Sequence, residues 1–141
     1  MLTGHCLCGG VRFEIHADLG PVIYCHCSMC RRASGSAFAS NASVAADAFR
    51  IVAGRELLSE YESSHGQFRA FCSRCGSPLY GRLNDAAILR RVRLGAIDGD
   101  PGRRAVAHIW IGSKSSWFRI TDALEQFEEE PPPAYCAPVD V

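Results

Sequence analysis

The sequence predicts a mainly β fold of short strands in one domain, and two observations carry this prediction. Apolar and polar residues alternate in several short runs, which is typical of strands with one buried face. Glycine breaks these runs, and a chain of 141 residues has the length of a single domain with its own core. We expect this domain to span residues 1–130, followed by a loose proline-rich tail at 131–141.

Strand signals follow one another along most of the chain. Residues 11–17 alternate between apolar and polar at every step, so we expect a half-buried strand there. His65-Gly66 is expected to form the turn of a hairpin between two further strands. Less regular runs rich in aromatic or β-branched residues are also predicted to be strands, namely 57–62, 68–72, 78–83 and 88–97.

Residues 105–112 form the last predicted strand, because they alternate again. His108 and Trp110 would share one face of it, opposite Ala107, Ile109 and Ile111. We expect the tryptophan to pack in the core rather than in a binding pocket, and the same holds for Trp117.

A short helix is predicted after this strand. Asp122, with Glu125 three positions later, has the pattern of an N-cap and its returning glutamate. Leu124 and Phe127 are the residues that this helix would bury. The prolines from residue 131 onward would prevent any continuation.

Composition and charge exclude several classes of function. The 15 Lys and Arg residues balance the 15 Asp and Glu residues, so the overall charge attracts no polyanion. No apolar run reaches the roughly 18 residues of a membrane span, and the N-terminus lacks the pattern of a signal peptide. We expect a cytoplasmic protein with no membrane or nucleic-acid partner, and a dispersed surface position for Arg90, Arg91, Arg93, Arg103 and Arg104.

Seven of the eight cysteines lie in three tight clusters, and the eighth, Cys136, stands alone in the tail as an exposed thiol. A cytosolic protein keeps its thiols reduced, and clustered free thiols bind metal ions. The clusters therefore favour metal sites over disulfides.

The first and last clusters together predict a closed structural zinc site. Cys72-x-x-Cys75 followed by glycine has the form of a zinc knuckle, and Cys6-x-Cys8 followed by two glycines resembles it. Together the pairs supply the four thiolates of a closed site. The rival interpretation is a redox-active Cys72–Cys75 pair, but no βαβ pattern surrounds it.

The middle cluster predicts an open site. Cys25, Cys27 and Cys30 lie in one short segment, and no fourth ligand is evident nearby. Three protein ligands with one free position are typical of catalytic zinc. A second closed site that borrows His5, His26 or another side chain stays open as the alternative.

The ligand type indicates the chemistry that an open site would support. Three thiolates leave a zinc centre with a formal charge of −1, which makes it a weak Lewis acid and a poor hydrolase. Such a soft centre favours a sulfur as its fourth ligand and deprotonates an incoming thiol. The bound thiolate can add to an aldehyde carbon, and the reverse step cleaves the C–S bond.

These motifs resemble the glutathione-dependent formaldehyde-activating enzyme family, which also includes centromere protein V. The resemblance extends over about residues 3–128, with softer matches at 95–98, 108–110 and 114–118. Three segments carry it: Gly4-His5-Cys6-Leu7-Cys8-Gly9-Gly10-Val11-Arg12-Phe13, Cys25-His26-Cys27-Ser28-Met29-Cys30-Arg31-Arg32 and Phe71-Cys72-Ser73-Arg74-Cys75-Gly76.

The resemblance implies a β-tent-type fold of packed antiparallel sheets with two zinc ions per chain. It places the structural zinc on Cys6, Cys8, Cys72 and Cys75, and the catalytic zinc on the remaining three clustered cysteines. The activity that it implies joins glutathione and formaldehyde into S-(hydroxymethyl)glutathione, which is carbon–sulfur lyase chemistry.

Three further residues are candidates for the site. Arg31 and Arg32 follow the middle cluster, where a guanidinium could hold a carboxylate of a glutathione-like thiol, although a solvated basic turn explains them equally well. His108 is a candidate general acid–base, with a purely structural histidine as the commoner alternative.

Two functions remain in competition. The leading one is a zinc-dependent carbon–sulfur lyase that acts on a thiol–aldehyde adduct such as S-(hydroxymethyl)glutathione. The alternative is a non-catalytic zinc-built module that recognises a macromolecule. Neither the physiological substrate nor the oligomeric state can be predicted from the sequence.

Overall fold

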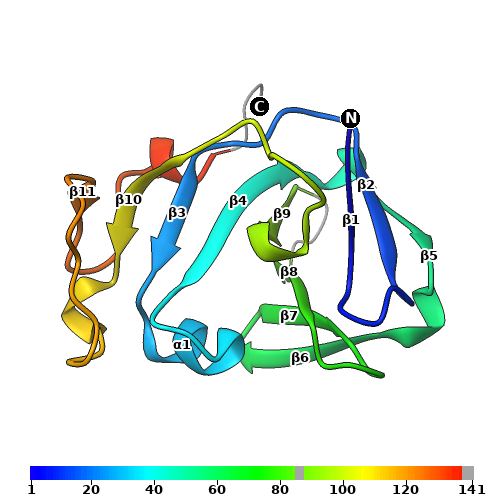
Figure 1. Cartoon of the computed structure of the whole chain (residues 1–141), viewed down its shortest axis with the longest axis horizontal. Helices are drawn as coiled ribbons and strands as arrows, with labels where there is room; N and C mark the ends of the chain where they lie inside the picture. Colours follow the sequence, from blue (N-terminus) through cyan, green and yellow to red (C-terminus); the bar gives the residue numbers. More distant parts are fainter. Residues whose placement is uncertain (85–87, 138–141) are drawn as a thin grey trace.

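The computed structural model describes residues 1–84 and 88–137, and these residues form two β-sheets and one α-helix (Figure 1). The smaller sheet has the order β1-β2-β5 and the larger one β11-β10-β3-β4-β9-β8-β7-β6. The helix α1 spans Ser28–Ser34. The strands are β1 (Leu2–His5), β2 (Arg12–Ile15), β3 (Val22–Cys25), β4 (Ala39–Ala45), β5 (Phe49–Ala53), β6 (Leu58–Ser64), β7 (Gln67–Cys72), β8 (Pro78–Leu83), β9 (Leu89–Arg93), β10 (Ala105–Ile109) and β11 (Glu125–Gln126).

The structure confirms the mainly β fold of packed antiparallel sheets. Every strand pair is antiparallel within the described ranges, except that β10 runs parallel to both β3 and β11. The expected hairpin is present, because His65 and Gly66 form the turn between β6 and β7, with Gly66 at a φ of 74°. A positive φ of this size is unfavourable for most other residues.

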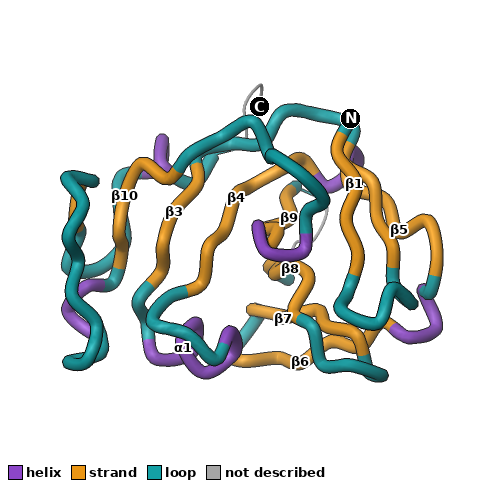
Figure 2. Tube along the Cα trace, in the orientation of Figure 1, coloured by secondary structure: helices purple, strands orange, loops and turns teal. Residues whose placement is uncertain are grey.

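The larger sheet is strongly bent, and the core fills the space between it and the smaller sheet. In Figures 1 and 2, β3 and β4 stand steeply on one side, β6 and β7 run almost horizontally below β8 and β9, and β1 and β5 stand on the opposite side from β3 and β4. Phe13 and Ile15 of β2 are almost fully buried. The rings of Phe13 and Tyr80 each lie 5.0 Å from that of Phe49, which joins the two sheets.

The helix predicted from Asp122 onward is wrong. Asp122 Oδ1 instead accepts a hydrogen bond from the Leu124 amide at 3.0 Å, and Glu125 and Gln126 pair with β10 as the short strand β11. Aspartate can stabilise such a turn as readily as a helix start, because its side chain bonds to the amide two residues later. Phe127 is half-buried and lies 5.2 Å from the ring of Tyr135.

The last predicted strand is shorter than expected, and from Ala107 onward both of its faces are covered. It ends at Ile109, because Trp110 adopts a left-handed conformation with a φ of 58° and a 3-10 turn follows. Ala107 and His108 are both nearly inaccessible. Trp117 is 71% exposed, so its expected core position is wrong.

The structure describes residues 131–137 of the expected tail. Residues 131–137 contain a 3-10 turn at Pro133–Tyr135, and the Tyr135 hydroxyl bonds to Glu125. Cys136 is half-buried rather than an exposed thiol. Residues 138–141 lie outside the described part of the chain. Within the described part, no helix is long and apolar enough to cross a membrane.

Candidate metal centres and the cavity

The fold brings the seven clustered cysteines together in two groups. One group contains Cys6, Cys8, Cys72 and Cys75, and the other contains Cys25, Cys27 and Cys30. Within each group, all sulfur atoms lie within 4.8 Å of one another. All eight cysteines belong to the described residues and carry free thiols, as the sequence predicts.

Two tight turns build the four-cysteine group. Cys6 follows β1 and Cys72 ends β7, so strands from different sheets deliver the two buried sulfurs. Each turn closes on a glycine with positive φ, 70° at Gly9 and 76° at Gly76. A side chain at either position would strain the turn.

The sulfur spacing in this group fits a tetrahedral metal ion. The sulfur of Cys8 lies 3.5 Å from that of Cys6 and 3.9 Å from that of Cys72. A zinc ion with Zn–S bonds of about 2.3 Å separates its sulfur ligands by about 3.8 Å. The Ser77 hydroxyl and amide lower the pKa of Cys75 to about 5, which favours its thiolate form. This group can hold a metal ion in a closed site.

The three-cysteine group, which we call the triad, is built around the start of α1. Cys25 ends β3, Cys27 is the N-cap of α1, and Cys30 lies in its first turn. The Cys27 sulfur accepts a hydrogen bond from the Cys30 amide at 3.3 Å, so one ligand caps the helix that carries another. The capping hydrogen bond at the start of α1 therefore helps to align Cys27 with Cys30.

Positive charge lies next to the triad. Both terminal nitrogens of Arg69 lie 3.8 Å from the Cys30 sulfur. Hydrogen bonds from the Cys25 and Cys27 thiols lower the pKa of Cys30, and the positive charges of Arg69 and Arg93 lower it further. This environment stabilises a thiolate, which is the form that binds metal.

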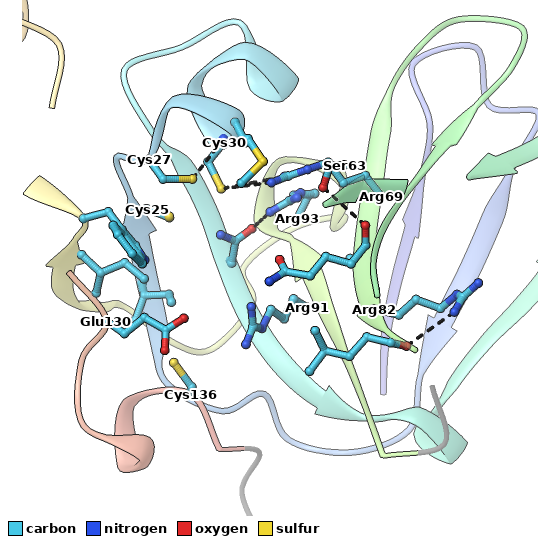
Figure 3. Close-up of a pocket in the computed structure, with 18 of the residues that line it drawn as sticks. Cys25, Cys27, Cys30, Ser63, Arg69, Arg82, Arg91, Arg93, Glu130 and Cys136 are labelled. Atoms are coloured by element: carbon cyan, nitrogen blue, oxygen red, sulfur yellow. Dashed lines mark hydrogen bonds between the residues drawn. The ribbon is translucent and has the colours of Figure 1, made fainter. Parts of the chain in front are cut away.

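The triad forms part of the wall of a cavity of about 420 Å³ (Figure 3). Arg69, Arg91 and Arg93 line it from β7 and β9, and Arg82 lines it from β8. Glu130 and Cys136 contribute to the wall from the segment after β11. The four-cysteine group does not line this cavity; its Cys6 contributes instead to the wall of a separate pocket that none of the triad cysteines lines.

A glycine keeps the centre of the arginine wall open. Gly81 of β8 stands in register with Arg69 on one side and Arg91 on the other. A Cβ atom there would meet Phe68 O at 3.6 Å and the Arg91 Cβ at 4.0 Å, which is ordinary contact. Glycine inside a strand often marks a place where a ligand approaches the backbone closely.

The two arginines proposed from sequence do not line the cavity. The Nε of Arg31 donates to the carbonyl of His26 at 3.3 Å, and Arg32 is exposed. Of the arginines that do line it, Arg91 and Arg93 were expected to be dispersed on the surface, and Arg69 and Arg82 were not singled out. The available signal was the alternation Arg91-Val92-Arg93, which puts two arginines on one strand face opposite a buried valine.

His108 also lies away from the cavity. Its Nδ1 is 2.7 Å from His26 Nε2, and its Nε2 is 3.0 Å from Asp122 Oδ2. Both imidazole rings are almost inaccessible. Burial lowers the pKa of His26 to about 4, so this imidazole is neutral near pH 7. The chain of hydrogen bonds supports the segment between Cys25 and Cys27 from behind.

Trp110 belongs to the cavity wall rather than to the closed core. It is the only described residue other than glycine with a positive φ. Its amide donates to the Glu129 carbonyl at 3.0 Å, which joins the end of β10 to the segment that leads to Glu130. Strained residues of this kind cluster at functional sites.

Fold and site define a mainly β protein with two thiol groups that can each hold a metal ion, one of them at a cavity. The family model described as glutathione-dependent formaldehyde-activating enzyme matches residues 1–113. The chain belongs to the glutathione-dependent formaldehyde-activating enzyme family. This confirms the resemblance seen in the sequence.

Two known proteins are similar to this chain. A curated protein of Halomonas elongata, provisionally named as a glutathione-dependent formaldehyde-activating enzyme, is 36% identical over 129 residues, which cover 85% of this chain and 81% of the relative. A crystal structure of a Rhodobacter sphaeroides protein has a TM-score of 0.56 and 27% identity. The match covers 70% of this chain and 89% of the Rhodobacter sphaeroides chain, and it supports the fold.

Proposed function

We propose that the protein is a zinc-dependent carbon–sulfur lyase that acts on a thiol–aldehyde adduct such as S-(hydroxymethyl)glutathione. One observation carries the proposal: the triad of thiols, and not the four-cysteine group, forms part of the cavity wall. The family name and the relative from Halomonas elongata support glutathione as the first thiol to test. A reducing cytoplasm suits both the free thiols and this substrate.

The donor sets support two zinc ions with different roles. Cys6, Cys8, Cys72 and Cys75 supply four sulfurs, the number of a closed structural site. Cys25, Cys27 and Cys30 supply three and leave one position for a ligand from the cavity. When bound by the triad, zinc supplies a position at which a thiol loses its proton and is held as a thiolate.

The reaction needs no oxidant or reductant. In one direction the thiol sulfur forms a bond to the aldehyde carbon, the C=O π electrons move to oxygen, and the proton lost by the thiol ends there. In the reverse direction the hydroxyl loses its proton, the carbonyl re-forms, and the C–S bond breaks with its electrons on sulfur.

The arginines beside the triad suit this charge distribution. A zinc ion with four thiolates carries a formal charge of −2, and Arg69 and Arg93 together carry +2. Arg69 already contacts the Cys30 sulfur, and burial lowers the pKa of Arg93. Fixed positive charge in a partly enclosed site stabilises a thiolate more strongly than it would in water.

His108 receives a supporting role in this proposal. Because its ring lies behind the triad segment and contacts His26 rather than the cavity, it positions that segment instead of transferring a proton to substrate. Arg31 holds the same segment through the His26 carbonyl.

Cobalt substitution tests the proposal directly. In the cobalt-loaded protein, glutathione should strengthen the sulfur-to-metal charge-transfer absorption, whereas S-methylglutathione should not, because it cannot become a thiolate. Exchange NMR on the zinc protein should show faster interconversion of glutathione and S-(hydroxymethyl)glutathione, and Cys27→Ser should remove that effect. A metal-loaded triad that responds to no thiol contradicts the lyase and favours the non-catalytic binding module.

A further inference from the structure

Charge pairing separates the ionic groups of the cavity into two sets. Arg82 forms an ion pair with Glu60, Arg93 bonds to Asn41, and Arg69 contacts the Cys30 sulfur. Arg91 and Glu130 remain. Within residues 1–84 and 88–137, the Arg91 guanidinium and the Glu130 carboxylate take part in no hydrogen bond or ion pair.

These two groups of opposite charge face the same part of the cavity without pairing. Figure 3 shows Arg91 and Glu130 on opposite walls, with Cys136 beside them and the triad at the other end. Both charges act on Cys136, because Arg91 lowers the pKa of its thiol and Glu130 raises it, although burial has the largest effect and raises it. Two opposite charges that face each other without pairing leave room for a ligand between them.

The backbone holds the two groups apart. Arg91 lies in β9 between β4 and β8, opposite Ser43 and Gly81. The segment leading to Glu130 is bonded to the end of β10: the Ile111 amide donates to Phe127 O at 3.1 Å and the Trp110 amide to Glu129 O at 3.0 Å. These hydrogen bonds fix the backbone segments that carry Arg91 and Glu130 on the two facing walls.

We propose that Arg91 and Glu130 form a subsite for an α-amino acid group, with Arg91 receiving its carboxylate and Glu130 its ammonium. This inference rests on the proposed thiol chemistry and names the class of thiol: one with a free α-amino acid group at the end remote from sulfur, as in the γ-glutamyl part of glutathione. Arginine matches a carboxylate in a bidentate manner. A lone glutamate on the facing wall repels a second carboxylate and attracts an ammonium group.

The position of Glu130 puts part of this subsite outside the segment that the family model matches. The family match covers residues 1–113, and Glu130 lies beyond it. The triad and the arginines of β7 and β9 lie inside it. Thiol chemistry is therefore built by the matched segment, whereas recognition of the ammonium group depends on the segment after it.

Two glutathione analogues isolate the two contacts. Glutaryl-cysteinylglycine keeps the carboxylate and lacks the ammonium group, and 4-aminobutanoyl-cysteinylglycine keeps an amine and lacks the α-carboxylate. Their affinities for the zinc-loaded protein can be measured by calorimetry. Each analogue should bind about 10- to 100-fold more weakly than glutathione, the range expected for losing a hydrogen-bonded charge.

Variants connect each contact to its residue. Glu130→Gln should weaken the affinity for glutathione about tenfold or more and leave the affinity for the glutaryl peptide unchanged. Arg91→Gln should weaken the affinity for glutathione about as much and leave the affinity for the aminobutanoyl peptide unchanged. Glu129→Gln and Arg119→Gln serve as controls, because neither side chain lines the cavity. Equal affinity of all three peptides, or equal losses in the control variants, overturns the subsite.

The subsite and the proposed function fail in different ways. 2-Mercaptoethanol has neither charged group, so its binding to the cobalt-loaded triad reports on thiol binding alone. If it binds and the three peptides do not differ, only the subsite is overturned. If no thiol binds to the loaded triad, the lyase is overturned and the subsite with it.

Discussion

At the scale of single residues, Gly81 determines how much space the arginine wall leaves free. Its neighbours in register, Arg69 and Arg91, both extend into the cavity, and glycine places no side chain between them. Its φ is not in the left-handed region, so the backbone does not require glycine here. The absence of a side chain at Gly81 therefore keeps space free in the cavity and is not required by the backbone conformation.

Substituting Gly81 should close the cavity without unfolding the protein. Gly81→Leu fills the space between the two arginines and should reduce thiol affinity about tenfold or more, while the melting temperature changes little because β-strands accept leucine. Gly81→Ala is the matched control, since the nearest atom to its Cβ lies at 3.6 Å. Calorimetry and circular dichroism measure the two effects. If the leucine variant kept its thiol affinity, the thiol would have to bind outside the space beside Gly81.

Individual residues also show what sequence reasoning can and cannot reach. The two cysteine groups were predictable in full, because each ligand lies close in sequence to a second one. The charged lining of the cavity was not predictable, because Arg69, Arg91 and Glu130 belong to three segments that only tertiary structure brings together. Arg31 and Arg32 were attractive for their proximity to Cys30 in sequence, but the helix turns them away from the cavity.

At the scale of elements, the strands β6, β7 and β8 are joined by a charge pair that spans the middle strand. Arg82 of β8 donates to Glu60 of β6 and lies over the ring of Phe68 in β7, 4.1 Å from its centroid. The hydrogen bond from Arg82 lowers the pKa of Glu60. One edge of the cavity thus depends on an interaction that acid can remove.

The contribution of this pair to stability should depend on pH. Because the pKa of Glu60 is lower in the folded than in the unfolded protein, the contribution is complete above the ordinary pKa of 4.5 and is lost as the pH falls through the folded value. Urea unfolding of wild type and Glu60→Gln should differ by about 0.5 to 1 kcal/mol at pH 7 and converge as the pH falls through the lowered pKa of Glu60.

Glu56→Gln is the control for this experiment, because Glu56 is exposed and belongs to a 3-10 turn outside the three strands. A difference between wild type and Glu60→Gln that is constant over the whole pH range would assign the effect to packing rather than to charge.

Elements were predictable where local pattern agreed with tertiary contacts. The hairpin at His65-Gly66 and the strands around it follow from turn chemistry and alternation. The signal at Asp122 failed because its carboxylate bonds to His108, 14 residues away in sequence, and the segment pairs with β10 instead of coiling. The alternation at 105–112 predicted one strand, but the strand ends at Ile109, and the rings of Tyr24 and Phe38 pack against His108 on its second face.

At the scale of the whole molecule, the two cysteine groups should contribute differently to stability. The four-cysteine group joins chain segments 64 residues apart, from Cys8 to Cys72, and connects the two sheets. The triad closes only a short loop around the start of α1. Constraining a long loop removes more conformational entropy from the unfolded chain than constraining a short one.

We expect Cys72→Ser to unfold or aggregate the protein and Cys27→Ser to leave it folded with one metal ion fewer. Structural zinc in this kind of site can contribute roughly 10–16 kcal/mol of apparent binding free energy to folding. Metal content and circular dichroism, followed during chelator titration of wild type, should show one loss of metal without unfolding and a second that coincides with it. Equal destabilisation by the two substitutions would make the triad structural as well.

The parallel pairing of β10 with β3 has a consequence for synthesis on the ribosome. Cys25 lies opposite Ile109, so the strand that presents the first ligand of the triad waits for a partner that is translated 84 residues later. Until then β4 can pair with one side of β3, and the other side is an open edge able to recruit a strand from another chain. The wall that carries Trp110 and Glu130 is translated last, so a chain that ends before β10 contains all seven clustered cysteines but leaves this edge of β3 unpaired.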